Sequence, residues 1–154
     1  TLYAICYTLM AAGSFAAIIL MSRKGFEAEE LSDYRGLFRT HPWFALMILL
    51  LMFSLAGVPP LFGFWAKLAV IRAAIDADLL WLAISAVVFA VIGAFYYLRV
   101  VKIMFFDAPS DEVRIEPQAD PQLRWVFSVN ALAMLVLGLF WSPLLDMCLA
   151  AFRG

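Results

Sequence analysis

The sequence predicts an all-α protein that crosses a membrane several times. Of its 154 residues, 66% are hydrophobic and 15% are charged, whereas a soluble domain averages about 45–50% apolar and about 25% charged residues. Four uncharged stretches, at 1–22, 43–66, 79–98 and 125–145, each approach the ~20 residues that a helix needs to span a bilayer. Their apolar residues run continuously rather than alternating, which favours helices over a membrane β-barrel.

We therefore expect a single membrane domain over 1–154 with four helices, at about 1–22, 43–75, 79–106 and 124–151. The first helix carries small residues around Gly13, which favour close helix packing in lipid. It begins at Thr1 without a methionine or a charged leader, so we expect the chain to be part of a longer subunit. A polar connection follows, and Pro42 is well placed for the first turn of the second helix.

The second helix is too long for one straight span. The stretch 43–75 would extend roughly 50 Å at ~1.5 Å per residue, against a hydrocarbon core of ~30 Å. Its middle reads SLAGVPPLFGFWAKLAV, where Pro59 and Pro60 both lack an amide donor and each costs ~3 kcal/mol in an ordinary helix. Gly57 and Gly63 add backbone freedom on either side. The sequence therefore predicts a discontinuous helix, broken near 57–63, whose freed carbonyls need protein or water nearby.

Lys67 is the candidate functional residue of this broken helix. A lysine near the bilayer centre costs about 2.5–3.5 kcal/mol on insertion scales. Carbonyls freed at a helix break can bind a cation, and burial favours the neutral form of a lysine. These features predict that Lys67 takes up and releases protons. The alternative is a side chain that extends to the outer membrane interface, as long basic side chains often do.

The third and fourth helices complete the topology. Basic residues gather in and beside the connections at 23–42 and 107–123, which places both connections in the cytoplasm by the positive-inside rule. The loop at 76–78 and the C-terminus then face the periplasm. Tryptophans and tyrosines lie near the expected interfaces, as in an aromatic belt.

Several classes of function are disfavoured. No basic patch indicates nucleic-acid binding, and the net charge is −1. Cys6 and Cys148 lie far apart in apolar stretches without a nearby histidine, so no metal-ligand spacing is present. No glycine-rich dinucleotide loop or cysteine cluster occurs, so we expect no flavin, iron–sulfur cluster or NADH on this chain.

Three blocks resemble one known family: FSLAGVPPLFGFWAKL, YRGLFRTHPWFA and YYLRVVKIMFFD. Together they are similar to the C-terminal part of the antiporter-like membrane-arm subunits of respiratory complex I, the NADH-quinone oxidoreductase, and most similar to the subunit N group. The first block alone is shared with Mrp-type sodium/proton antiporter subunits. In this resemblance Lys67 matches the lysine of the second broken helix, where the sister subunit M typically has a glutamate.

The resemblance implies the second half of an inverted-repeat antiporter-like fold. It implies that the chain belongs to an enzyme complex that couples NADH oxidation and quinone reduction to proton pumping. FMN, iron–sulfur clusters and quinone would then be bound elsewhere in the complex. Implied partners are subunit M, small subunits such as K, and lipids, in a bacterial inner membrane. Two alternatives stay open, a cation/proton antiporter subunit of the Mrp type without a redox partner and a structural membrane subunit that only packs and seals.

Overall fold

The computed structural model describes residues 2–21, 31–108, 120–143, 146–147 and 150. All regular secondary structure in these residues is helical, which confirms the predicted fold class. In chain order the elements are α1 (Leu2–Met21), the 3-10 helix η1 (Leu31–Tyr34), α2 (Leu37–Thr40), α3 (Pro42–Ala56), α4 (Phe62–Asp76), α5 (Leu80–Phe106) and α6 (Pro121–Leu139).

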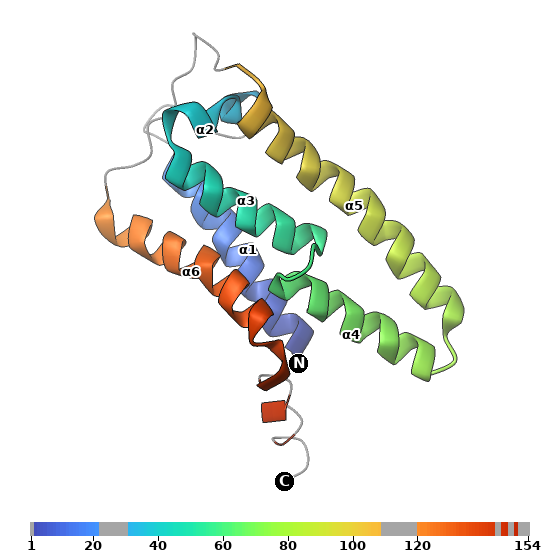
Figure 1. Ribbon diagram of the computed structural model, residues 1–154. Helices are drawn as coiled ribbons and strands as arrows, with labels where there is room; N and C mark the ends of the chain where they lie inside the picture. The colour runs from blue at the N-terminus through green and yellow to red at the C-terminus, as the bar shows by residue number, and fades with distance from the viewer. Residues whose placement is uncertain (1, 22–30, 109–119, 144–145, 148–149, 151–154) are drawn as a thin grey trace.

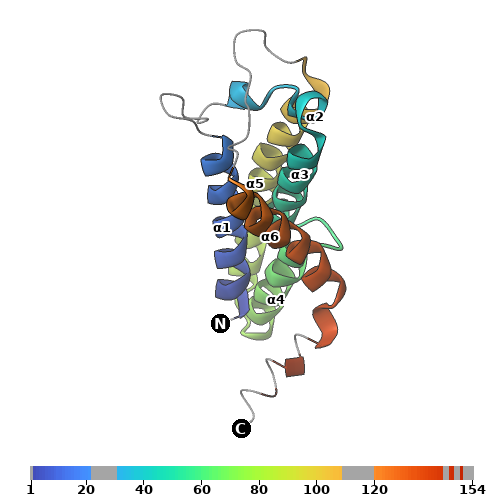
Figure 2. The ribbon, with the colours of Figure 1, turned by 90° about the vertical axis from the view of Figure 1, so that its left-hand side faces the viewer.

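In the part of the chain that the structure describes, three helices are long and apolar enough to cross a membrane alone, and two shorter helices share a fourth crossing. The long segments are Tyr3–Leu20, Leu80–Phe106 and Pro121–Leu139. Helices α3 and α4 have 15 residues each and so are only ~22 Å long, less than the ~30 Å hydrocarbon core. Because α4 continues the course of α3 in both views (Figures 1 and 2), the pair forms the discontinuous second membrane helix.

The polar connections lie at one end of the bundle. Helix α2, the C-terminal end of α5 and the N-terminal end of α6 all lie toward the upper left of Figure 1, and the α4–α5 turn lies at the opposite end. Two contacts hold the residues before α2 against the end of α5: the Gly36 amide donates to the Ile103 carbonyl at 3.2 Å, and Arg35 lies 3.8 Å from the Asp107 carboxylate. Residues 22–30 and 109–119, which include much of both connections, lie outside the described residues.

The core lies between α1, α3 and α6. Its fully buried side chains include Cys6, Leu20, Met47, Leu51, Phe127 and Met134. Helix α5 reaches this core near its C-terminal end through the buried Met104, and Ala83 is its other buried residue. Much of the rest of α5 carries exposed apolar side chains, among them Trp81, Phe89 and Phe95, which suits lipid or another protein rather than water.

The fourth helix, predicted over 124–151, corresponds to α6 and the helical residues that follow it. Helix α6 begins at Pro121 and ends at Leu139, and residues 141–143 form a further helical turn after Phe140. Pro143 has no amide hydrogen to donate to the Leu139 carbonyl, which explains why the regular hydrogen-bond ladder stops there. The predicted end at 151 lies outside the described residues.

Candidate functional site

Helix α3 ends at Ala56 in a glycine cap. Gly57 has φ +85°, a left-handed conformation that glycine adopts without steric cost. The Gly57 amide donates to the Ser54 carbonyl at 3.1 Å, and the Val58 amide donates to the Phe53 carbonyl at 2.9 Å. These two hydrogen bonds define a Schellman motif, so the helix is terminated in a specific geometry rather than frayed.

The Lys67 amine replaces the two backbone donors that the prolines remove. In a continuous helix the amides of residues 59 and 60 would donate to the carbonyls of Leu55 and Ala56, four residues earlier, but Pro59 and Pro60 have no amide hydrogen. The Lys67 Nζ atom donates to these same carbonyls, at 2.7 Å to Leu55 and 3.1 Å to Ala56. A cation at the C-terminal end of a helix also interacts favourably with the helix dipole. The prolines and the lysine therefore form one structural unit, and the amine is directed at α3 rather than along α4 toward the outer interface.

Ser54 joins both halves of the break to α1. Its side chain is fully buried; its oxygen accepts a hydrogen bond from the Gly63 amide at 3.1 Å, and its hydroxyl donates to the Met10 sulfur at 3.3 Å. The first amides of a helix have no partner within that helix, so Ser54 supplies from α3 a cap that the N-cap residue Leu61 does not provide. A methyl group on Gly63 would overlap the Ser54 carbonyl, which explains why a residue without a side chain lies there.

Helix α6 closes the other side of the break. A methyl group on Gly138 would overlap the Pro60 carbonyl, so α6 approaches the backbone of the break directly. Trp141 packs edge-on against Phe62 at 5.8 Å and stacks on Trp65 at 6.1 Å between ring centroids. These contacts hold the start of α4 in place while leaving Lys67 on the opposite side.

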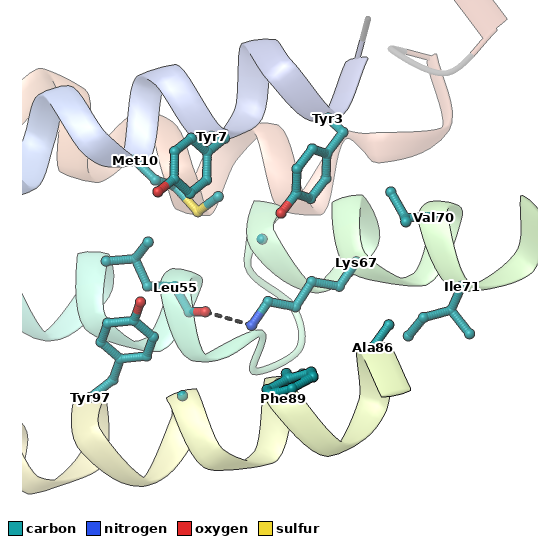
Figure 3. Close-up of a pocket in the computed structure, with 13 residues that line it drawn as sticks. Tyr3, Tyr7, Met10, Leu55, Lys67, Val70, Ile71, Ala86, Phe89 and Tyr97 are labelled. Carbon is teal, nitrogen blue, oxygen red and sulfur yellow. Dashed lines mark hydrogen bonds between the residues drawn. The ribbon is translucent and has the colours of Figure 1, made fainter. Parts of the chain in front are cut away.

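A cavity of about 350 Å³ lies beside Lys67 between α1, α4 and α5. Tyr3 and Tyr7 of α1 and Tyr97 of α5 extend into it from either side of the amine, and Phe89 lies beneath the lysine (Figure 3). Three phenol groups and an amine thus border one space whose other walls are mostly apolar, and water in it would find hydrogen-bond partners at the amine and the phenols. A second cavity of about 360 Å³, between α4 and α5, also reaches Lys67.

The structure brings all the predicted site residues to one place. Gly57, Pro59, Pro60 and Gly63 form or flank the turn between α3 and α4, and Lys67 contacts α3 across it. Sequence reasoning missed the side chains that other helices contribute, namely Ser54, Met10 and the three tyrosines. Ser54 was identifiable in principle, because a serine in an apolar helix three residues before a Gly-x-Pro-Pro turn is a ready hydrogen-bonding group.

The described residues contain no group of three or more His, Cys, Asp or Glu side chains that could hold a metal ion. The polar groups that converge on Lys67 are hydroxyls and carbonyls. Their arrangement suits hydrogen bonding of a protonated amine and of water.

Residues 1–93 match the family model described as NADH:quinone oxidoreductase/Mrp antiporter, transmembrane. A relative in Xanthomonas euvesicatoria pv. vesicatoria, named NADH-quinone oxidoreductase subunit N, is 53% identical over 152 residues, covering 99% of this chain and 31% of its own length. A protein of the same name in Thioalkalivibrio sulfidiphilus is 52% identical over 149 residues, with 97% and 31% covered. The chain thus spans about a third of the length of these curated relatives.

A solved structure of respiratory complex I from Thermus thermophilus, with bound aureothin, contains a chain of similar fold. The TM-score is 0.77 and the sequence identity 30%, over 90% of this chain and 31% of that one.

Proposed function

This chain belongs to the NADH:quinone oxidoreductase/Mrp antiporter family of transmembrane proteins, and from that premise we propose that it forms part of a proton-translocating membrane subunit of an NADH:quinone oxidoreductase. Relatives named subunit N match nearly the whole chain at about half identity, which supports a subunit of the N type. The single observation that carries the functional proposal is the Lys67 amine bound to the carbonyls at the end of α3.

Two opposing influences act on the proton of Lys67. The carbonyls of Leu55 and Ala56 and the C-terminal end of α3 stabilise the ammonium. The apolar side chains around the cavity favour the neutral amine. A small movement of α3 relative to α4 changes the distances to the carbonyls and thus shifts the balance between charged and neutral forms. Hydrogen bonds to a charged donor are roughly twice as strong as neutral ones, so the protonation state in turn affects how tightly the two half-helices are held together.

The tyrosine-lined cavity provides the space through which Lys67 exchanges its proton. Hydroxyl groups both donate and accept hydrogen bonds. Water ordered by Tyr3, Tyr7 and Tyr97 would therefore connect the Lys67 amine to the far side of the cavity, between α1 and α5. Moving one proton against 100 mV costs ~2.3 kcal/mol. In this proposal the energy comes from NADH oxidation and quinone reduction at FMN, iron–sulfur clusters and quinone bound by other subunits, with subunit M and small subunits such as K as neighbours.

The proposed orientation is that of a bacterial inner-membrane protein. The connections near 23–42 and 107–123 would face the cytoplasm, and 76–78 and the C-terminal side would face the periplasm. The common position of α2, the end of α5 and the start of α6 at one end of the bundle (Figure 1) supports this arrangement, together with the basic residues of those connections.

A cation/proton antiporter of the Mrp type is the second candidate, because the family model covers both groups. An affinity tag on the full-length protein that contains this chain separates the two. We expect the tag to recover a membrane assembly with flavin and iron–sulfur absorbance and NADH oxidation activity. Recovery of a membrane assembly without flavin would favour the antiporter.

Replacement of Lys67 by alanine tests the role of the site within that assembly. We expect assembly with fewer protons pumped per electron. Normal assembly with normal pumping would mean that the chain only packs and seals.

A further inference from the structure

A third cavity, remote from Lys67, lies where the N-terminal ends of α3 and α6 meet. Its volume is about 520 Å³, and its walls include Trp43 and Phe44 of α3 and Arg124 and Trp125 of α6. It continues along α6 past Val129 to Leu132, which lies ~12 Å from Arg124 at 1.5 Å per residue. We call this space the α3–α6 groove. It is polar and cationic at one end and apolar along its length.

Arg124 supplies the positive charge. Its guanidinium carbon lies 5.2 Å from the centroid of the Phe44 ring, a cation–π contact that orients the planar group without neutralising it. No carboxylate of the described residues forms an ion pair with Arg124. Asp120, one turn earlier, directs its carboxylate to the amide of Gln122 at 3.0 Å as the N-cap of α6.

The start of α3 adds to this potential. Helices α3 and α6 begin at Pro42 and Pro121 at the same end of the bundle, and neither has an acidic residue in its first turn. Helix N-termini carry partial positive charge. The Asp120 carboxylate already caps the start of α6, so the added positive potential comes from the start of α3. Beside it lies Arg124, for which the described residues supply no ion-pair partner.

Two tryptophans place the cationic end of the groove at the edge of the membrane. Trp43 is 51% exposed and Trp125 is 71% exposed, and tryptophan is enriched at the level of lipid headgroups. The indole of Trp43 donates to the Ser128 hydroxyl at 3.0 Å, which ties α3 to α6 and fixes one wall. Below this level the exposed Val129 and Leu132 face the groove.

We propose that the α3–α6 groove binds an anionic phospholipid, with the phosphate group at Arg124 and an acyl chain along Val129 and Leu132. A ligand that is anionic at one end and hydrocarbon over ~12 Å matches both parts of the groove. The inference is independent of the proton chemistry at Lys67, because the two sites lie at opposite ends of α3.

The test uses the intact membrane protein containing this chain, in nanodiscs with a photoactivatable phosphatidylglycerol probe and peptide mapping of the crosslinked sites. We expect crosslinks on peptides from the start of α3 and of α6, reduced by excess phosphatidylglycerol but not by phosphatidylcholine. Arg124→Gln should lower crosslinking about fivefold, the contribution of one basic residue near an anionic surface. Arg124→Lys should retain most of the crosslinking. Lys102→Gln is the control and should not change it, because Lys102 is an exposed lysine near the C-terminal end of α5 and does not line the groove.

Three results would overturn the proposal. Equal competition by phosphatidylcholine would show that the groove does not select for the negative charge of the lipid headgroup. Crosslinking that survives Arg124→Gln unchanged would remove the arginine from the site. Absence of crosslinks at the groove in the wild-type protein would show that another protein segment covers it. The competition and mapping experiments on wild-type protein decide the question even if Arg124→Gln fails to assemble.

Discussion

Replacing Lys67 with methionine should loosen the junction between α3 and α4. Methionine keeps the length and apolar stem of the side chain but removes the charge and all three N–H donors. The carbonyls of Leu55 and Ala56 then lose the donor that replaces the missing proline amides. An unsatisfied buried acceptor costs about 1–3 kcal/mol. Because Lys67 is only half-buried, water reaches part of the site, and the lower limit for each carbonyl gives a loss of about 2 kcal/mol.

Hydrogen exchange measured by mass spectrometry on the intact assembly reports this loss locally. Peptides spanning residues 54–64 contain the amides of the glycine cap and of Gly63. A loss of about 2 kcal/mol in opening free energy accelerates their exchange about 30-fold, since each 1.4 kcal/mol is a factor of ten. Arg72→Met is the matched control, because Arg72 is an exposed residue one and a half turns further along the same helix.

Exchange in Lys67→Met that is no faster than in Arg72→Met would refute the reasoning. It would mean that the two carbonyls are satisfied by water at no cost and that Lys67 is not a structural cap. Lys67→Arg supplies a conservative variant, because arginine keeps charge and donors and should hold exchange close to the wild-type rate.

Three other changes test separate parts of the structure. Tyr97→Phe should slow proton uptake linked to NADH oxidation by about tenfold, less than the ~10²-fold typical for a group that itself transfers the proton. Tyr96→Phe, on the exposed side of α5, should leave proton uptake unchanged. Equal rates in the two variants would show that Tyr97 has no part in proton uptake. Gly63→Ala should lower the stability of the assembly on the order of 1–3 kcal/mol, measured by thermal unfolding, because the added methyl group overpacks against the α3 backbone. Gly93→Ala, where the methyl group would make only an ordinary contact to one tyrosine ring, should not lower it. Equal stability of the two variants would disprove the close approach of Gly63 to the α3 backbone. Burial, and secondarily a neighbouring aspartate, raises the pKa of Tyr34 from 10.0 to about 12. As the pH rises the unfolded chain loses this proton first, so the stability that Tyr34 contributes is complete below pH ~10 and declines up to pH ~12. Alkaline denaturation should therefore be less steep in Tyr34→Phe than in wild type, and identical curves would contradict the raised pKa.

The sequence predicted the broken helix because its cause is local. Pro59 and Pro60 remove amide donors whatever surrounds them, so the break and the loss of partners around residues 54–56 follow from the chain alone. The presence of a cation near those carbonyls was also predictable, since Lys67 lies two turns beyond the break. The family resemblance, rather than the spacing, indicated complex I, and the relatives named NADH-quinone oxidoreductase subunit N confirm that resemblance.

The rest of the site depends on how helices cross. Tyr3, Tyr7 and Tyr97 come from two helices far apart in sequence, and a tyrosine near the end of a membrane helix is equally expected in the interfacial belt. Met10 is adjacent to Ser54 only because α1 packs against the break. The predicted end of the fourth helix at 151 stays a prediction, because residues 151–154 lie outside the described part of the chain.

The most direct test of the proton-loading role of Lys67 is the number of protons pumped per electron in the Lys67→Arg variant of the intact complex. Arginine retains the charge and the hydrogen bonds to α3 but does not release its proton in proteins. The account predicts an assembled complex that oxidises NADH with a reduced proton-to-electron ratio. An assembled Lys67→Arg complex with the full wild-type ratio would contradict it.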